Sequence, residues 1–437
     1  MKKLLLSAAV AQLAAVAAVA QDYDNVDPSD TDITIWYRVT RGGAEAMEAI
    51  IADFNATNDF GITATGVSAG HYGEIYDKFM NLVGTDELPN IVIAYQNQAS
   101  AFETAGGLID INPLFNSEKW GLEAELADNI PAGYLSADLN PDHDFQRLGF
   151  PPRRSMDIMY VNTDWLAELG FDAIPSTPAE LEEAACAATE AGFSGAVDTE
   201  TTPTGMTFGP DASRVASFIF AFGGDVYDYD ANQFDYDSDE SLAAMQFISD
   251  LAAKGCLRME AERYGAQTDF GNGVSLFTLG SSSGLPFYRG AVDQAAGFEW
   301  TISALPHTTE TPQINVFGPS FSIVDASEEQ EIASWLWMKH FVGASTQAAF
   351  VEATNYYPVN GAAFEYLGDY IEANPQYTIG RELINYARSE APVGAYQSVR
   401  RIVGPALAAI TEGADVAETM EDINIEANEL LEESRAD

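Results

Sequence analysis

Strand-like and helix-like segments alternate over residues 32–97, and this alternation constrains the fold more than any other feature of the sequence. The run DITIWYRV is apolar and rich in β-branched and aromatic residues, which predicts a buried strand. AEAMEAIIADFNATN then repeats apolar residues at helical spacing, and strand, helix and strand follow again in ITATGVSA, YGEIYDKFMNLVGT and LPNIVIAYQN. Strands that alternate with helices form parallel sheets, so the sequence predicts an α/β fold.

The ends of these predicted strands indicate where a ligand would bind. Open α/β sheets bind ligands in the crevice beyond the carboxyl ends of their strands. Trp36 and Tyr37 lie near the end of the first predicted strand, and Tyr95 and Gln96 lie near the end of the third. We therefore predict that these side chains face a cleft.

The first 31 residues read as an export signal and a leader rather than as part of the fold. Residues 1–20 contain two lysines, then a short alanine-rich apolar run that ends in Ala-Val-Ala, the pattern of a cleavable signal peptide. Residues 21–31 form an acidic leader. No later run has the roughly 18 apolar residues of a membrane-spanning helix. We expect a protein exported to the periplasm, and its remaining length predicts two domains.

Acidic residues dominate the charge of the chain. It has 67 Asp and Glu against 20 Lys and Arg, a formal net charge of −47. This charge repels nucleic acid and anionic membrane surfaces, so we expect neither as a partner, and it favours a monomer. Because 47% of the residues are hydrophobic and 11% aromatic, a solvated acidic surface explains the charge better than disorder does.

The two cysteines, Cys186 and Cys256, both fall in the exported part. An oxidising compartment favours one disulfide over two free thiols. STPAELEEAACAATEAG (176–192) and SDESLAAMQFISDLAAKGC (238–256) each carry helix start and stop signals. A bridge would therefore join two neighbouring helices.

No combination of residues predicts catalysis or a metal cofactor. The four histidines are scattered, and HExxH, GxSxG and glycine-rich phosphate motifs are absent. The acidic run DVYDYDANQFDYDSDE (225–240) raises a calcium site as one reading, but Gln233 stands where an EF-hand loop needs glycine. Its alternating tyrosines favour a solvated hairpin before a helix. We expect neither a metal nor another cofactor.

Four segments combine small, aromatic or basic residues in patterns that suit a polar ligand. They are PPRRSMDIMYVN (151–162), GSSSGLPFYRG (280–290), ATNYYPVN (353–360) and YQSVRRIVGPAL (396–407). Serines and glycines offer hydroxyls and amides to an oxygen-rich ligand, or form an ordinary turn. Arginine pairs bind anions or sugar hydroxyls, or pair with surface acids. For Arg153 and Arg154 both readings stay open, and we favour one arginine in each role.

The order of these segments resembles a known family. ITIWYRV, FPPRRSMDIMYVNTDWLAELGF, FGNGVSLFTLGSSSG, NVFGPSFSIV and TNYYPVN follow one another as in the family 1 extracellular solute-binding proteins, receptors of sugar-type ABC importers, and most resemble the glycerol-3-phosphate and glycerophosphodiester-binding group. The resemblance implies a clamp of two α/β lobes, each a sheet flanked by helices, joined by hinge strands. It implies residues 32–149 and 300–343 in lobe 1, and residues 150–299 and 344–437 in lobe 2.

The resemblance also implies ligand-binding positions. Carried over residue by residue, they fall on Tyr72, Gln96, Ser155, Ser281 or Ser282, Gly318, Tyr356 and Arg400. Gln96 stands where the family has an acid, and GPDASRVAS (209–217) lacks the family's tryptophans. These departures favour a neutral sugar over a glycerol phosphate ester, whose phosphate Arg400 would bind.

These observations predict a receptor that binds a carbohydrate or polyol-type solute without chemistry. Aromatic faces such as those of Trp36, Tyr37, Tyr72 and Tyr356 would stack on the apolar side of the solute. The open clamp would close by hinge rotation and present the solute to the permease subunits of an ABC importer. The alternative is a secreted carbohydrate-active enzyme, which would release product from a glycoside.

Overall fold

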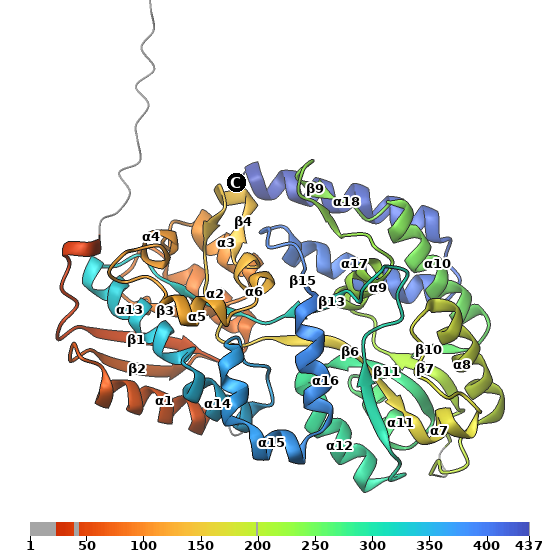
Figure 1. The fold of residues 1–437 in the computed structure, drawn as a ribbon. Coiled ribbons are helices and arrows are strands. Elements are labelled where there is room, and N and C mark those ends of the chain that lie inside the picture. The colour runs from red at the N-terminus through yellow and green to blue at the C-terminus, as the bar shows by residue number, and fades with distance from the viewer. Residues whose placement is uncertain (1–22, 39–42, 198–199, 437) are drawn as a thin grey trace, which may run out of the picture.

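Two lobes lie side by side, the first on the left of Figure 1 and the second on the right. The computed structural model describes residues 23–38, 43–197 and 200–436. The predicted signal peptide, residues 1–20, lies outside these ranges. Each lobe is built on its own sheet with helices packed around it. The predicted α/β arrangement of two lobes is therefore confirmed.

The sheet of the first lobe has the strand order β14-β3-β1-β2. Its strands are β1 (Asp32–Tyr37), β2 (Thr63–Ser68), β3 (Ile91–Ala94) and β14 (Ser320–Ile323). The first three are parallel, as the alternation of the sequence predicts, and β14 pairs antiparallel with β3. Helices α1 (Gly43–Thr57), α2 (Tyr72–Leu82) and α13 (Glu328–Phe341) pack on these strands.

The sheet of the second lobe has the order β10-β7-β11-β6-β13-β15, and β12 pairs additionally with β6. Its strands are β6 (Ser155–Asn162), β7 (Thr204–Phe208), β10 (Leu257–Met259), β11 (Ser275–Ser281), β12 (Trp300–Ser303), β13 (Ile314–Phe317) and β15 (Ala387–Ser389). Because β6 is central, all eight of its residues are buried. Its first residues also lead out of the hinge, so this rigid strand positions the segment 150–155 between the lobes.

The chain returns to the first lobe later than the expected boundary at residue 300. Strands β12 and β13 pair with β6 of the second sheet, and only β14 joins the first. The crossing falls at Gly318, whose φ of 152° suits glycine and where a Cβ would lie 3.0 Å from the carbonyl oxygen of Arg153. Helix α14 (Ala344–Thr354), expected in lobe 2, packs on α1. The apolar pattern of a strand identifies the strand but not its partner, which is why the sequence misplaces this crossing.

The remaining helices cover both lobes and the region between them. They are α3 (Gln96–Thr104), α4 (Asn112–Phe115), α5 (Ala124–Asp128), α6 (Ala132–Ser136), α7 (Thr163–Glu168), α8 (Pro178–Ala191), α9 (Ala212–Ala221), α10 (Asp239–Ala253), α11 (Gly265–Gly271), α12 (Leu285–Gln294), α15 (Gly368–Ala373), α16 (Gln376–Leu383), α17 (Tyr396–Thr411) and α18 (Val416–Ala436). α8 starts with the predicted capping box, in which the Thr177 side chain accepts from the Glu180 amide.

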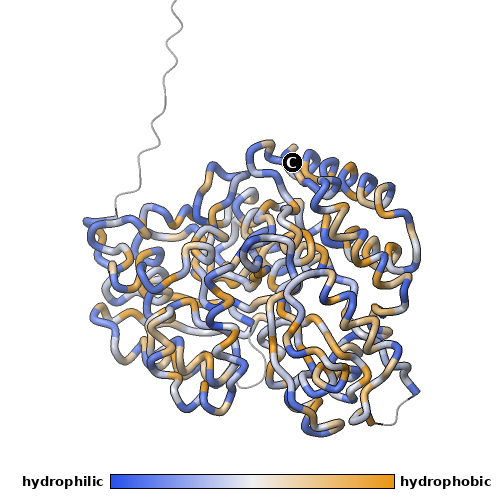
Figure 2. The backbone as a smooth tube through the Cα atoms, turned by 45° about the vertical axis from the view of Figure 1, so that its right-hand side comes forward, coloured by the Kyte–Doolittle hydropathy of each residue, from blue (hydrophilic) through white to orange (hydrophobic). Residues whose placement is uncertain are grey.

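The C-terminal helix α18 packs on α17 and α10 with one face. Its buried residues are Val416, Met420, Ile423, Ala427 and Leu431, at the three- and four-residue spacing of one helical face. Hydrophilic and hydrophobic stretches accordingly alternate along its tube in Figure 2. The helix thus extends the apolar core of the second lobe, although it comes from the far end of the chain.

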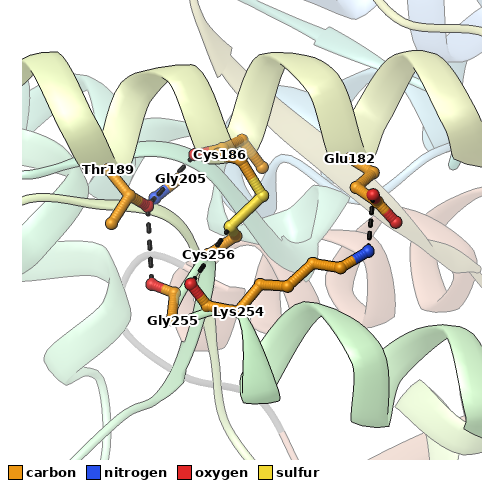
Figure 3. Close-up of a disulfide and its surroundings, with 8 residues drawn as sticks. Glu182, Cys186, Thr189, Gly205, Lys254, Gly255 and Cys256 are labelled. Carbon is orange, nitrogen blue, oxygen red and sulfur yellow. Dashed lines mark hydrogen bonds and ion pairs between the residues drawn. A yellow bond between two sulfur atoms is a disulfide. The ribbon is translucent and has the colours of Figure 1, made fainter.

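A disulfide joins Cys186 in α8 to Cys256, which follows α10 (Figure 3). The two Cα atoms lie 4.7 Å apart. Beside the bridge, Nζ of Lys254 lies 2.6 Å from a carboxylate oxygen of Glu182 and links the same two segments. The structure therefore brings the two predicted helices together at the cysteines.

The acidic run at 225–240 forms the short hairpin β8 (Tyr227–Asp228) and β9 (Gln233–Phe234) before α10, as its tyrosine pattern predicts. In the part of the chain that the structure describes, no group of three or more His, Cys, Asp or Glu side chains is placed to hold a metal ion. Within the same ranges, no helix combines the length and the apolar character needed to cross a membrane.

Candidate functional site

Three passages of the chain run side by side between the lobes. The first, residues 150–155, pairs with residues 317–321 on one side and with Tyr357 on the other. These passages carry five of the predicted site residues, namely Arg153, Arg154, Ser155, Gly318 and Tyr356. Segments that are far apart in the sequence therefore meet at the hinge.

A cavity of about 390 Å³, which we call the Arg400 cavity, lies between the lobes. The first lobe contributes the start of α3, and the second lobe contributes the starts of α9 and α17. Six residues that the sequence predicts at the cleft line the cavity: Tyr95, Gln96, Arg154, Ser281, Gly318 and Arg400. The sequence did not single out four charged or aromatic residues that also line it, namely Asp211, Arg214, Glu390 and Tyr396.

Arg400 is held by two carboxylates. Its Nη1 lies 2.5 Å from Glu390 and its Nη2 lies 3.1 Å from Asp211. Nη1 also donates to the hydroxyl of Ser213 at 2.9 Å. Burial alone would lower the pKa of Arg400, but Glu390, Tyr396, Asp211 and Tyr236 together outweigh burial, and the pKa lies above its ordinary value. Both partners are negative, so the guanidinium is already neutralised by the protein.

Arg214 enters the same cavity from α9 and forms an ion pair with Asp157 of β6. The Asp157 carboxylate is fully buried, and Ser217 donates to it at 2.7 Å. Burial raises the pKa of Asp157, and the Arg214 charge opposes that shift. Asp157 thus fixes Arg214 at the wall of the cavity.

Gln96 crosses from the first lobe to the hinge. Its side-chain nitrogen donates to Asp138 at 2.9 Å, to the Ser320 hydroxyl at 3.1 Å and to the Gly318 carbonyl at 3.3 Å. The amide donors are therefore engaged by the protein, and the glutamine serves the hinge as well as lining the cavity.

Two further cavities continue the cleft. One of about 470 Å³, the Tyr288 cavity, shares Asp211, Arg214 and Ser281 with the Arg400 cavity. The other, of about 640 Å³ and here called the Arg38 cavity, shares Tyr264, Ser283 and Phe287 with the Tyr288 cavity. Shared walls make the three cavities one continuous cleft, in which residues of the second lobe alone line the Tyr288 cavity.

Three predicted residues, Tyr72, Arg153 and Tyr356, line the Arg38 cavity. Nη2 of Arg153 donates to the Tyr72 hydroxyl at 3.0 Å and to the Arg38 carbonyl at 3.1 Å. The guanidinium carbon of Arg153 lies 4.8 Å from the centre of the Tyr356 ring. The structure thus brings these three side chains together, and the Tyr72 ring lies 4.9 Å from that of Tyr95, which lines the Arg400 cavity.

Arg154 has a different environment from its neighbour. Its side chain is 1% exposed and its Nη2 lies 3.2 Å from the buried carboxylate of Asp138. Nη1 donates to the carbonyls of Gly318 and Pro319, both at 3.2 Å. Arg154 therefore joins the first two hinge passages, although part of it reaches the wall of the Arg400 cavity.

Four predicted site residues do not line the three cavities. Trp36 and Tyr37 are each 4% exposed and belong to the core of the first lobe. The hydroxyl of Ser155 donates to the Phe317 carbonyl, and that of Ser282 accepts from the Met156 amide. Trp36 and Tyr37 were predicted only because they lie at the end of a strand. That position alone does not show whether a side chain faces the cleft or packs under a helix.

Two of the residues that the sequence analysis missed could have been recognised from their sequence context. Asp157 is a lone acid within the apolar strand segment SMDIMY, and a buried acid needs a partner. Asp211 begins α9 as its N-cap and lies in GPDASRVAS, where the expected tryptophans are absent. Glu390 and Tyr396 carry no comparable signal, because only the fold brings them to Arg400.

Comparison with solved structures gives the same fold. The sugar-binding protein MalE of Xanthomonas citri aligns with a TM-score of 0.78 at 16% identity, covering 93% of this chain and 98% of that one. The cyclic alpha-maltosyl-1,6-maltose binding protein of Arthrobacter globiformis aligns with a TM-score of 0.75 at 18% identity, covering 92% of this chain and 99% of that one. UgpB of Mycobacterium tuberculosis, solved with glycerophosphocholine, aligns with a TM-score of 0.73 at 19% identity, covering 93% of this chain and 99% of that one.

Sequence comparison then settles the family. A search of curated protein sequences finds no match. The family model described as bacterial extracellular solute-binding protein matches residues 49–379, a range that includes every strand of the two lobe sheets except β1 and β15. That family consists of solute receptors rather than enzymes, in agreement with the prediction. The chain belongs to the bacterial extracellular solute-binding proteins.

Proposed function

We propose that the protein captures a carbohydrate or polyol-type solute in the interlobe cleft, outside the cytoplasm, and delivers it to the permease of an ABC importer. The observation that carries the proposal is the Arg400 cavity, whose walls come from both lobes and combine charged side chains with apolar surface. A solute that contacts both walls favours the closed arrangement over the open one, which is how binding would drive closure.

The charges around the Arg400 cavity suit a part of the solute that is rich in hydroxyl groups. Each arginine in its wall has a carboxylate partner: Arg154 pairs with Asp138, Arg214 with Asp157, and Arg400 with Asp211 and Glu390. A hydroxyl group both donates and accepts, so it can bind carboxylates and guanidinium groups alike without adding charge. A phosphate at Arg400 would have to compete with two carboxylates.

The aromatic residues of the cleft support the same solute class. Tyr72 and Tyr356 line the Arg38 cavity, and Tyr264, which is 63% exposed, lies at the wall shared by two cavities. Aromatic rings stack on the apolar faces of sugar rings, and an exposed ring beside a polar cleft is suited to that role. The related sugar-binding proteins and the glycerophosphocholine complex of UgpB are consistent with the proposed class.

A thermal-shift screen of sugars, polyols and their phosphates tests the proposal. A ligand at 100 times its Kd stabilises the folded state by about 2.7 kcal/mol, which raises the melting temperature measurably. We expect hits among carbohydrates or polyols, saturable 1:1 binding in calorimetry, and no product when a glycoside hit is incubated for a day. A screen without any such hit would refute the proposed solute class, and steady product release would establish the enzyme instead.

A further inference from the structure

The Arg38 cavity differs from the Arg400 cavity in whether its arginines are paired with carboxylates. Arg38 and Arg153 line it, and neither forms an ion pair with any carboxylate of the described residues. The four residues 39–42, which lie outside those ranges, contain no acid in their sequence. Glu352 also lines the cavity, but it is exposed and is bonded to neither arginine. In a chain with 67 acids, two arginines without an acid partner in one cavity need an explanation.

The charge of Arg153 is buried without compensation from a carboxylate. The residue is 2% exposed, and its Nε and Nη1 are buried without a hydrogen-bond partner among the described residues. The rings of Tyr356 and Phe350 lie 4.8 and 5.4 Å from the guanidinium carbon. An aromatic ring stabilises a nearby cation less than a carboxylate would. The charge of Arg153 therefore leaves a positive potential in the cavity.

An anion that is attracted by this potential would contact Arg38 and the Tyr72 hydroxyl. Arg38 is only partly buried, and its guanidinium carbon lies 4.7 Å from the centre of the Tyr72 ring. Because Tyr72 accepts a hydrogen bond from Arg153, its own hydroxyl proton is left to donate. One accessible guanidinium and one polarised hydroxyl together match an anionic oxygen group.

We propose that the Arg38 cavity binds an anionic oxygen group of the solute, a carboxylate or a phosphate ester, through Arg38 and the Tyr72 hydroxyl, backed by Arg153. This inference rests on the proposed function, because the hydroxyl-rich part of the same solute occupies the Arg400 cavity. The Tyr288 cavity shares walls with both and gives an elongated solute a continuous path. The solute is therefore an acidic saccharide or a phosphorylated saccharide or polyol, with its charge in the Arg38 cavity rather than at Arg400.

The test uses pairs of solutes that share one saccharide and differ in whether it carries an anionic group. Digalacturonic acid is compared with its dimethyl ester, and trehalose 6-phosphate with trehalose, within a wider panel of uronic acids, sugar phosphates and their neutral counterparts. Kd values are measured by calorimetry on the full-length mature protein at low salt. We expect the charged member of at least one pair to bind at least about tenfold tighter than its neutral counterpart. Whether the uronates or the phosphates show this difference identifies the source of the anionic group.

Two variants assign the effect to the cavity. Arg38→Gln removes the accessible charge and Tyr72→Phe removes the donor while keeping the ring, and both avoid the buried Arg153. Each should abolish most of the preference for the charged solute, measured as the ratio of the two Kd values within a pair, whereas the control below should keep the wild-type ratio. Arg381→Gln is the matched control, because Arg381 also lies on an aromatic ring, 4.4 Å from the centre of Phe364, but lines none of the three cavities.

The outcomes separate this inference from the proposed function. Neutral and charged members that bind equally tightly would overturn the inference and leave the proposed function standing. A preference for charge that survives in both Arg38→Gln and Tyr72→Phe would also overturn it. If no member of the panel binds, charged or neutral, the proposed function fails and the inference fails with it.

Discussion

Arg435 and Asp142 form an ion pair that joins the last helix of the second lobe to the first lobe. Nη2 and Nε of Arg435 donate to the same Asp142 oxygen at 2.8 and 3.0 Å. Nη1 of Arg435 donates to the Asn232 carbonyl, so the guanidinium is anchored in its own lobe as well. In Figure 1 the C-terminal end of α18 accordingly reaches β4 (Leu139–Asn140) at the top of the first lobe. The pair therefore favours the lobe arrangement seen here.

We expect Arg435→Gln to let the protein without solute sample other lobe arrangements more often. Partly exposed pairs are worth about 0.2–1 kcal/mol, enough to change lobe populations by up to about fivefold. Small-angle scattering should show a different radius of gyration for the variant at low salt, and wild type should approach the variant at high salt. Lys254→Gln, which breaks an ion pair within the second lobe, is the control. Identical curves for wild type and Arg435→Gln at both salt concentrations would contradict this role.

Arg154 should matter for stability more than any exposed arginine. Arg154→Met leaves the Asp138 carboxylate, which is 2% exposed, without its charged partner. Removing one partner of a buried ion pair costs about 3–5 kcal/mol. Urea unfolding should show this loss, whereas Arg381→Gln at the surface should change the unfolding free energy by less than about 0.5 kcal/mol. A loss below about 1 kcal/mol for Arg154→Met would show that the hinge does not depend on this pair.

The arginine pair illustrates how far the sequence leads. PPRRSMD stands out because it places two arginines together in a strongly acidic chain. The order of the motifs along the chain identifies the fold family and the hinge. Arg154 contacts Asp138, 16 positions away, and Arg153 contacts Tyr72, 81 positions away. Only the packing of the lobes brings these residues together, so the sequence does not show which arginine has which partner. The strands β12 and β13 are recognisable from their composition, but their pairing with β6 depends equally on contacts that are distant in sequence.

Glu103 should make the protein less stable as the pH rises. Burial, together with Asp110 and Asp325, raises the pKa of Glu103 to about 7 in the folded state, against an ordinary value of 4.5. A carboxyl with a raised folded pKa contributes stability below the unfolded value and loses it as the pH climbs through the folded value. Glu103→Gln should therefore stabilise the protein at pH 8 by on the order of 1 kcal/mol and have little effect at pH 4.

Denaturant unfolding at several pH values between 4 and 8 checks this prediction. The exposed Glu125 of α5 provides the control, since Glu125→Gln should leave the pH profile unchanged. A Glu103→Gln profile that runs parallel to wild type would contradict the assigned cause.

The disulfide between Cys186 and Cys256 should stabilise the second lobe without being essential to the fold. The bridge closes a loop with a sequence separation of 70, for which loop-closure entropy gives about 4 kcal/mol. Reduction should lower the melting temperature while far-ultraviolet circular dichroism stays the same at 25 °C. Thiol labelling of the exported protein under denaturing conditions should find no free cysteine before reduction. Two labelled thiols at that stage would exclude the bridge.

The most direct test of the central claim is calorimetric titration of the best hit from the solute screen into wild type, Arg400→Gln and Arg381→Gln. If the interlobe cleft binds a carbohydrate or polyol, wild type should bind one equivalent. Arg400→Gln should bind about tenfold more weakly, because it removes a donor of the cavity and leaves Glu390 and Asp211 without their partner. Arg381→Gln should match wild type. A hit that binds Arg400→Gln as tightly as wild type would contradict the account, because the solute would not contact the Arg400 cavity.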